Sequence, residues 1–270
     1  KSERREESEM AKRLRFCHKV SRLFQPTNVV PIGAQVKNKD ILSKSYKLMI
    51  DGGIIAHSHT GFFYLLPLAT RALDKLTRLV DDHMINIGAQ KISCPTLTSS
   101  DIWEKTGRLS MAGPELFHLK DRHSKDFILS PTHEESITQM LASQSTLSYK
   151  QLPLLLYQTT AKFRDEMKPR FGLLRTREFL MKDLYSFDTS AETAQATYKL
   201  VSQAYHRIFE AIGVNFIKVR GLSGVMGGEV SHEFHYPSAI GDDTLRSCDD
   251  CGHGWNKESN ENDPCEQCGS

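Results

Sequence analysis

The sequence predicts an α+β fold, with an antiparallel sheet as its platform and helices flanking that sheet. Two long segments, 68–87 and 189–213, carry apolar residues at helical spacing. Between them, residues 162–187 hold two strand-like stretches on either side of a basic loop, which predicts a hairpin. Residues 90–94 and 214–220 also have strand character.

The first helix is expected over residues 68–87, where Gly88 ends it and Pro95 follows the short strand after it. Its core-facing stripe comprises Leu73, Leu76, Val80, Met84 and Ile87.

The second helix is expected to begin at a capping box of Thr189 and Glu192 and to end at Gly213. Its buried stripe comprises Tyr198, Val201, Tyr205, Ile208 and Ile212.

The predicted hairpin carries the clearest chemistry. In its first stretch, strand alternation places Arg164 and Glu166 on one face. In its second stretch, Arg175, Phe179 and Asp183 are four apart and share a face. An arginine guanidinium can donate two parallel hydrogen bonds to a phosphate, and an aromatic ring can stack on a nucleotide base. A carboxylate can accept a hydrogen bond from the exocyclic amine of that base. The pattern indicates a nucleoside triphosphate site; an ordinary amphipathic hairpin with solvated charges is the alternative.

The cysteines do not resemble a disulfide framework, because Cys17 and Cys94 stand alone. The other four form two C-x2-C pairs separated by thirteen residues, the spacing of a structural zinc ribbon that binds one Zn²⁺. His253 is a possible substitute ligand, and four free thiols in a polar tail are the alternative. The predicted metal ligands are Cys248, Cys251, Cys265 and Cys268.

Composition limits the function classes. A net charge of +2 over 270 residues gives no global polybasic signature, so any RNA contact must come from local patches. No stretch approaches 18 apolar residues, so no membrane span is expected. Residues 10–39 are basic and lack acidic side chains, as in mitochondrial transit peptides. A disordered basic tail is the alternative, and a first residue of Lys suggests a fragment or processed form.

Residues 60–234 resemble the catalytic core of prolyl-tRNA synthetases, a family of class II aminoacyl-tRNA synthetases. The hairpin is similar to their motif 2, F-R-x-E followed by a loop and R-x3-F-x3-D/E. PTHEE, SYKQLP and KPRFG favour proline and the bacterial and organellar branch, and the resemblance implies a mitochondrial enzyme of an animal. The strings that carry the resemblance are YLLPLATRALDKL, IGAQKISCPTL, FILSPTHEES, SYKQLPLLLYQTTAKFRDE and GGEVSHEF.

The resemblance implies a division of the chain. Residues 41–240 would form the catalytic core with motifs 1 and 2, residues 1–40 a flexible segment with a transit-peptide remnant, and residues 241–270 the cysteine-rich module. Motif 1, the helix and strand before Pro95, would build a homodimer interface.

The resemblance also implies residue roles. Arg164 would bridge the α-phosphate of ATP and the proline carboxylate, and Glu166 would read the adenine amine. Arg175 would bind the γ-phosphate and Phe179 would stack on adenine, with Mg²⁺ accompanying the ATP. Such transfer chemistry depends on positioning and charge stabilisation.

Proline itself would be bound by a second group of residues. Thr132 and Glu134 match a T-x-E loop that holds the secondary ammonium. Thr132 with Glu135 also reads as a helix capping box. His232, in the SHEF string, could line the proline pocket or be a structural histidine, and His133 is expected to be structural or exposed.

The expected activity is ATP-dependent attachment of proline to tRNA(Pro) through prolyl-adenylate, in the mitochondrial matrix or alternatively the cytoplasm. The chain shows no editing domain, motif 3 or anticodon-binding domain, so we expect residues 1–270 alone to form no adenylate. A non-catalytic synthetase-like binding module and a class II synthetase for serine or threonine are the alternatives.

Overall fold

The computed structural model describes residues 20–27, 43–144, 147–221 and 231–238, with parts of the cysteine-rich tail. In the tail these are residues 240, 241, 243–248, 250, 251, 254–256, 265, 268 and 269. Most of the transit-peptide-like segment, including Cys17, lies outside the described residues, as does His253. Structural statements below concern the described residues.

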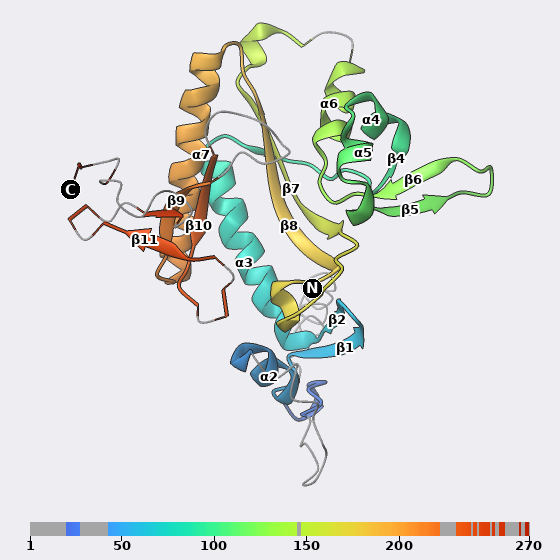
Figure 1. Ribbon diagram of the computed structural model, residues 1–270, viewed down its shortest axis with the longest axis vertical. Coiled ribbons are helices and arrows are strands. Elements are labelled where there is room, and N and C mark those ends of the chain that lie inside the picture. The colour runs from blue at the N-terminus through green and yellow to red at the C-terminus, as the bar shows by residue number, and fades with distance from the viewer. Residues whose placement is uncertain are drawn as a thin grey trace, which may run out of the picture.

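The centre of the molecule is a long antiparallel hairpin. Strands β7 (Leu154–Phe163) and β8 (Glu178–Phe187) pair over their full lengths, and β3 (Gln90–Lys91) joins β7 in parallel. The hairpin separates the two sides of the fold (Figure 1). The predicted α+β architecture is therefore confirmed, although the strand expected over residues 90–94 is shorter.

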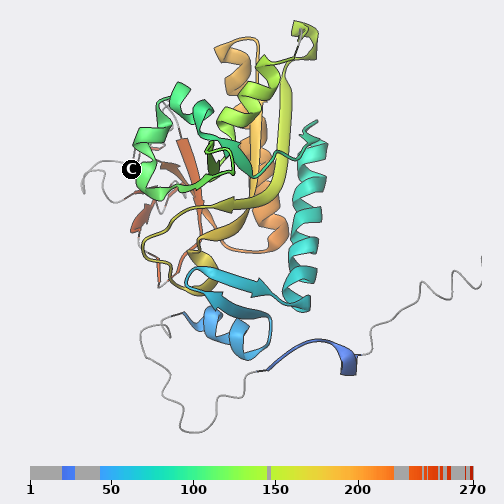
Figure 2. The same ribbon diagram turned by 90° about the vertical axis from the view of Figure 1, so that its right-hand side faces the viewer.

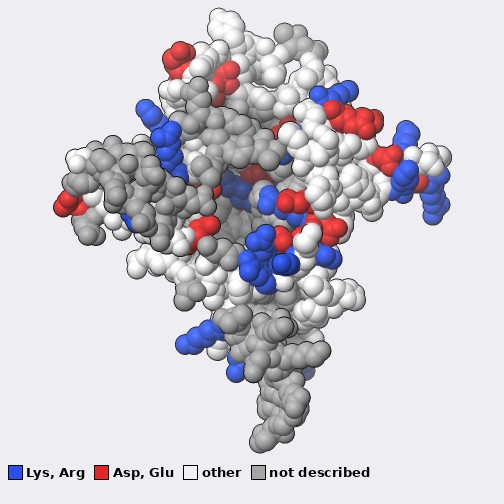
Figure 3. Space-filling model, viewed as in Figure 1, with Lys and Arg blue, Asp and Glu red and all other residues white. Residues whose placement is uncertain are grey.

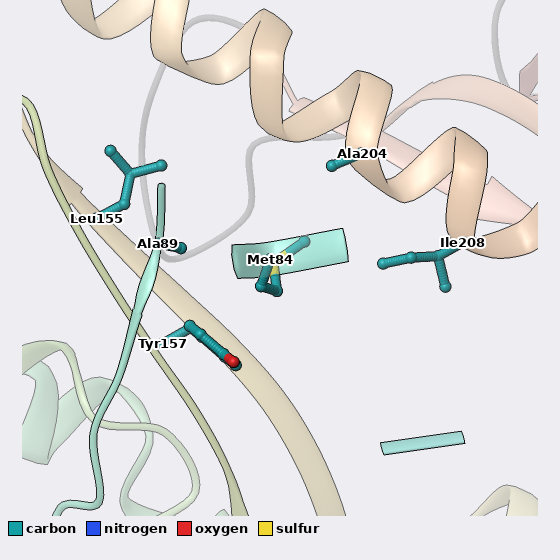
Figure 4. Close-up of a cluster of buried hydrophobic side chains, with 6 residues drawn as sticks. All are labelled: Met84, Ala89, Leu155, Tyr157, Ala204 and Ile208. Atoms are coloured by element: carbon teal, nitrogen blue, oxygen red, sulfur yellow. The ribbon is translucent and has the colours of Figure 1, made fainter. Parts of the chain in front are cut away.

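Helices α3 (Pro67–Asn86) and α7 (Ala191–Ile212) lie on one side of this hairpin, as Figure 2 shows. Proline at the first turn of α3 presents no unsatisfied N–H there. The apolar side chains of both helices meet the hairpin in one core cluster (Figure 4). That cluster comprises Met84, Ala89, Leu155, Tyr157, Ala204 and Ile208.

The predicted helices are confirmed with local corrections. The capping box of α7 is formed by Ser190 and Thr193, so the predicted pair of Thr189 and Glu192 is wrong. Gly213 ends α7 in the left-handed conformation, as expected. The predicted apolar stripe of α7 is only partly buried, because Tyr198 is 42% exposed and directs its hydroxyl to a histidine of a neighbouring sheet. Leu76 of α3 and Ile212 of α7 are likewise exposed.

A second lobe covers the other side of the hairpin (Figures 1 and 2). It contains a three-stranded sheet of order β4-β6-β5 and helices packed around the buried Trp103 and Ile128. Its elements are β4 (Leu97–Ser99), α4 (Ser100–Lys105), α5 (Arg108–Met111), β5 (Phe117–Lys120), β6 (Asp126–Leu129) and α6 (Glu134–Ala142).

A third sheet, of order β10-β9-β12-β11, packs on α7 through Phe234, whose ring stacks on Phe209. Its strands are β9 (Ile217–Gly221), β10 (Ser231–His235), β11 (Leu245–Ser247) and β12 (Gly254–Asn256). The N-terminal part adds η1 (Val20–Arg22), α2 (Lys44–Asp51), β1 (Ile55–His59) and β2 (Phe62–Leu65). Short 3-10 turns are η2 (Gly113–Glu115), η3 (Tyr149–Gln151) and η4 (Gly172–Leu174).

Among the described helices, none combines the length and the apolar character that crossing a bilayer would need.

Candidate active site

The face of the β7–β8 hairpin away from α3 and α7 carries a group of polar side chains. Strand register pairs Lys162 with Phe179 and Gln158 with Asp183, so these side chains share that face. The second lobe covers it (Figure 2). One face of the hairpin thus builds the hydrophobic core, and the other presents the predicted chemistry.

The connection between the two strands differs from the sequence prediction. β7 ends at Phe163 and β8 begins at Glu178, so Arg164, Glu166 and Arg175 lie in the connecting segment outside both strands. The Arg164 N–H still bonds to the Arg177 carbonyl, and the ladder ends at Asp165, whose N–H bonds to the carbonyl of Glu115 in the second lobe. The assignment to strand faces is therefore wrong for Glu166 and Arg175, whereas Arg164 directly follows β7 and extends its ladder by one bond.

The predicted nucleotide ligands nevertheless meet in pairs. The Arg164 guanidinium lies over the Phe179 ring, 5.4 Å from its centroid. Arg175 Nε donates to Glu166 Oε2 at 2.8 Å, and the Lys168 N–H donates to the same carboxylate at 3.2 Å. The Arg175 hydrogen bond, followed by that from Lys168, lowers the pKa of Glu166. Glu166 is therefore a carboxylate at neutral pH.

The connecting segment borders a charged hollow. Figure 3 shows positive and negative side chains gathered around a depression beside the end of the hairpin. A cavity of about 400 Å³ is lined by Arg170, Phe171 and Arg175 of the segment and by Tyr46 and Phe63 of the N-terminal part. Of the four predicted nucleotide ligands, Arg175 lines this cavity, whereas Arg164, Glu166 and Phe179 do not.

The T-x-E residues lie at the start of α6. The Thr132 hydroxyl donates to Glu134 Oε2 at 2.7 Å, so the two predicted ammonium ligands are in direct contact. His133 is the N-cap residue and makes no side-chain capping bond. The alternative capping box of Thr132 and Glu135 is wrong, because the Glu135 carboxylate accepts from Thr106 and Arg108 instead.

Arg108 joins this group and was missed from the sequence. Its Nη1 is 3.2 Å from Glu134 and 2.7 Å from Glu135, and its guanidinium lies over Trp103. Arg108, Glu134 and Glu135 line a cavity of about 430 Å³ together with Lys105. Its two carboxylates therefore face two cations, so the lining is formally neutral. Because Arg108 is far from Glu134 in sequence, no local pattern could reveal this contact.

A buried polar cluster lies beneath the site. Lys162 is fully buried, and its Nζ donates to Asp183 at 2.8 Å. Gln158 and Tyr185 also donate to that carboxylate. His133 is fully buried too, and burial lowers its pKa, so its ring is neutral. Of the two expectations for His133, structural or exposed, the structural one is confirmed. In the sequence, the one sign of this cluster is that Asp183 and Tyr185 are two residues apart, which places both side chains on the same face of a strand.

His232 has a different neighbourhood. It lies on β10, and its Nδ1 is 2.8 Å from the Tyr198 hydroxyl of α7. It lines a separate hollow of about 730 Å³ together with Lys218, Arg220 and Cys251. Neither Thr132 nor Glu134 lines that hollow, so a role for His232 in proline binding stays a prediction.

The four cysteines of the tail converge. All four Sγ atoms lie within 4.8 Å of one another, and the contacts Cys248–Cys268 and Cys251–Cys265 are 3.5 Å. Cys248 and Cys251 lie in the connection between β11 and β12, and Gly254 of β12 pairs with Val219 of the core strand β9. Zn–S bonds of about 2.3 Å in a tetrahedron separate sulfurs by about 3.8 Å. The cluster therefore fits one zinc ion.

Comparisons with known proteins agree with this geometry. Residues 117–254 match the family described as "tRNA synthetase class II core domain (G, H, P, S and T)". Proteins named "Probable proline--tRNA ligase, mitochondrial" from Rattus norvegicus and Homo sapiens are each 49% identical to this chain, covering 88% and 89% of it and 51% of their own lengths. A proline--tRNA ligase of Thermotoga maritima is 44% identical over 79% of this chain and 37% of its own.

A solved structure, "Giardia lamblia Prolyl-tRNA synthetase in complex with prolyl-adenylate", matches with a TM-score of 0.60 and 23% identity. The match covers 64% of this chain and 36% of that one, and at this identity it supports the fold alone. The chain spans about half the length of the mitochondrial relatives.

Proposed function

Because the chain belongs to the class II tRNA synthetase core family, we propose that it acts in the ATP-dependent attachment of proline to tRNA(Pro). The observation that carries this proposal is 49% identity to mitochondrial proline--tRNA ligases over most of the chain. Contacts among the motif 2 residues and, separately, the contact between Thr132 and Glu134 support it.

In the proposed reaction, a proline carboxylate oxygen attacks the α-phosphate of ATP, and pyrophosphate leaves. A hydroxyl of the terminal tRNA ribose then attacks the prolyl carbonyl, and AMP leaves. Arg164 would hold the carboxylate and the α-phosphate together, while Phe179 and Glu166 bind adenine. Arg175 would bind the γ-phosphate, which requires it to exchange Glu166 for phosphate. Mg²⁺ would accompany the triphosphate and offset its charge.

Proline recognition would depend on the Thr132–Glu134 pair. Glu134 keeps a third of its side-chain surface exposed, so its carboxylate remains accessible to a secondary ammonium. His232 is proposed as a further pocket residue on the strength of the SHEF resemblance.

Direct binding tests the choice of amino acid. We expect the protein to bind a non-hydrolysable analogue of prolyl-adenylate more tightly than the threonyl and seryl analogues, measured by titration calorimetry. Tighter binding of either competitor would contradict the proposal and favour another class II synthetase. Pyrophosphate exchange, measured on the full product of the gene, distinguishes a ligase from a binding module, since a module would bind the prolyl analogue without exchange.

We also propose a structural zinc ion in the tail. Purified protein should contain one zinc per chain, and Cys265→Ser should lose it because three thiolates bind zinc less tightly than four. Cys94→Ser is the matched control, since Cys94 is not in the cluster and should leave zinc content unchanged. Elemental analysis measures both. Zinc well below one equivalent after expression in zinc-supplemented medium would indicate free thiols.

Assembly and location are further proposals. Exposed apolar side chains of α3, Leu76 and Ile85, support a homodimer through motif 1. The mitochondrial names of the relatives support a mitochondrial protein, and we place its activity in the matrix, where organellar tRNA is charged.

A further inference from the structure

The Tyr185 hydroxyl lies between two parts of the candidate site. It donates to Asp183 Oδ2 at 2.6 Å and accepts from the backbone N–H of His133 at 2.9 Å. The Thr132 hydroxyl lies 3.3 Å from it. A side chain of β8 therefore holds the loop that carries the T-x-E residues.

The Asp183 carboxylate, to which Tyr185 donates, is itself held by two side chains of β7. Asp183 also accepts from Lys162 Nζ at 2.8 Å and from Gln158 Nε2 at 2.9 Å, both on β7. Burial, followed by the hydrogen bond to Asp183, raises the pKa of Tyr185, so its hydroxyl keeps its proton near neutral pH. The hydroxyl therefore remains a donor to Asp183 and leaves its lone pairs for the loop.

The same loop is tied to β7 by its backbone. The Phe163 N–H donates to the Ser130 carbonyl at 3.1 Å, immediately before Arg164. The loop is thus bonded at Ser130 to the end of β7 that leads into Arg164, and at His133 to β8. One of these ties is backbone only, whereas the other depends on a single phenolic oxygen.

We propose that Tyr185 is a positioning residue that sets the spacing between the amino-acid half of the site and its nucleotide half. The amino-acid half is Thr132 and Glu134, and the nucleotide half is Arg164 and Phe179. This inference rests on the proposed function. A ligand that bridges both halves gains affinity from the two halves together only when their spacing is fixed. The affinity of a ligand that occupies one half does not depend on that spacing.

The test compares a bridging ligand with a single-half ligand. In Tyr185→Phe, the affinity for the prolyl-adenylate analogue should fall roughly tenfold or more, because the His133 N–H and the Asp183 carboxylate each lose a buried partner. The affinity for ATP should stay within about twofold of the wild-type value, since ATP would occupy only the nucleotide half. The readout is the ratio of the two dissociation constants.

Tyr157→Phe is the matched control. Tyr157 is fully buried on the neighbouring strand, and its hydroxyl donates to Asp81 at 3.0 Å on the opposite side of the hairpin. The Tyr157→Phe variant loses the same hydroxyl oxygen and a similar hydrogen bond, yet it should leave the ratio of the two dissociation constants unchanged. An unchanged ratio in Tyr185→Phe, or an equal change in both variants, would overturn the inference.

Hydrogen exchange needs no variant and keeps the inference testable if Tyr185→Phe does not fold. In the wild-type protein, the His133 amide should exchange slowly, because it is bonded to Tyr185. Fast exchange at that amide would overturn the inference. Failure of the wild-type protein to prefer the prolyl analogue would instead refute the proposed function, so the two failures are distinguishable.

Discussion

Replacing Arg164 with alanine should abolish proline-dependent activation. We expect the affinity for the prolyl-adenylate analogue to fall roughly a hundredfold, and any proline-dependent pyrophosphate exchange to fall roughly a thousandfold, as when a charge-stabilising donor is lost. Arg164 is the cation that the site places against Phe179, whereas Arg175 is already paired with Glu166. Alanine offers no donor to the α-phosphate.

The control for this variant is Arg122→Ala. Arg122 is exposed in the turn between β5 and β6, remote from the hairpin connection, so it should leave binding and exchange unchanged. Thermal melting of both variants checks that they fold. Analogue binding by Arg164→Ala at wild-type strength would mean that the nucleotide is bound elsewhere.

Local sequence patterns predicted the elements that local forces decide. The apolar stripe that ends at Ile87, followed by Gly88, predicted α3, and Gly213 marked the end of α7, because helix periodicity and left-handed caps are properties of short segments. The strand ends near Arg164 and Arg175 were wrong. There the ladder yields to a bond between Asp165 and Glu115, which lie in different lobes.

The same distinction applies to the site. Thr132 and Glu134 could be assigned from a short motif, and their contact agrees with it. Arg108 and Tyr185 could not be assigned, because each acts on that motif from another element brought close by the tertiary fold. Sequence reasoning therefore found candidate substrate ligands and missed the side chains that hold them.

The buried ion pair beneath the site should dominate the stability of the hairpin. In Lys162→Met, Asp183 would keep its carboxylate in the interior without its cation, and breaking such a pair typically costs about 3–5 kcal/mol of unfolding free energy. Gln158 and Tyr185 would still donate to the carboxylate, but neither carries a positive charge. Denaturant unfolding, followed by circular dichroism, measures this loss.

Lys91→Met is the matched control, because Lys91 also lies on the central sheet and pairs with an aspartate, Asp81, at 2.5 Å. Its side chain is 46% exposed, so water screens the pair and its loss should cost at most about 1 kcal/mol. Adding Asp183→Asn to Lys162→Met should recover part of the loss, since no buried charge then lacks a partner. Equal costs for the two lysine variants would show that Lys162 contributes packing alone and that Asp183 does not depend on its charge.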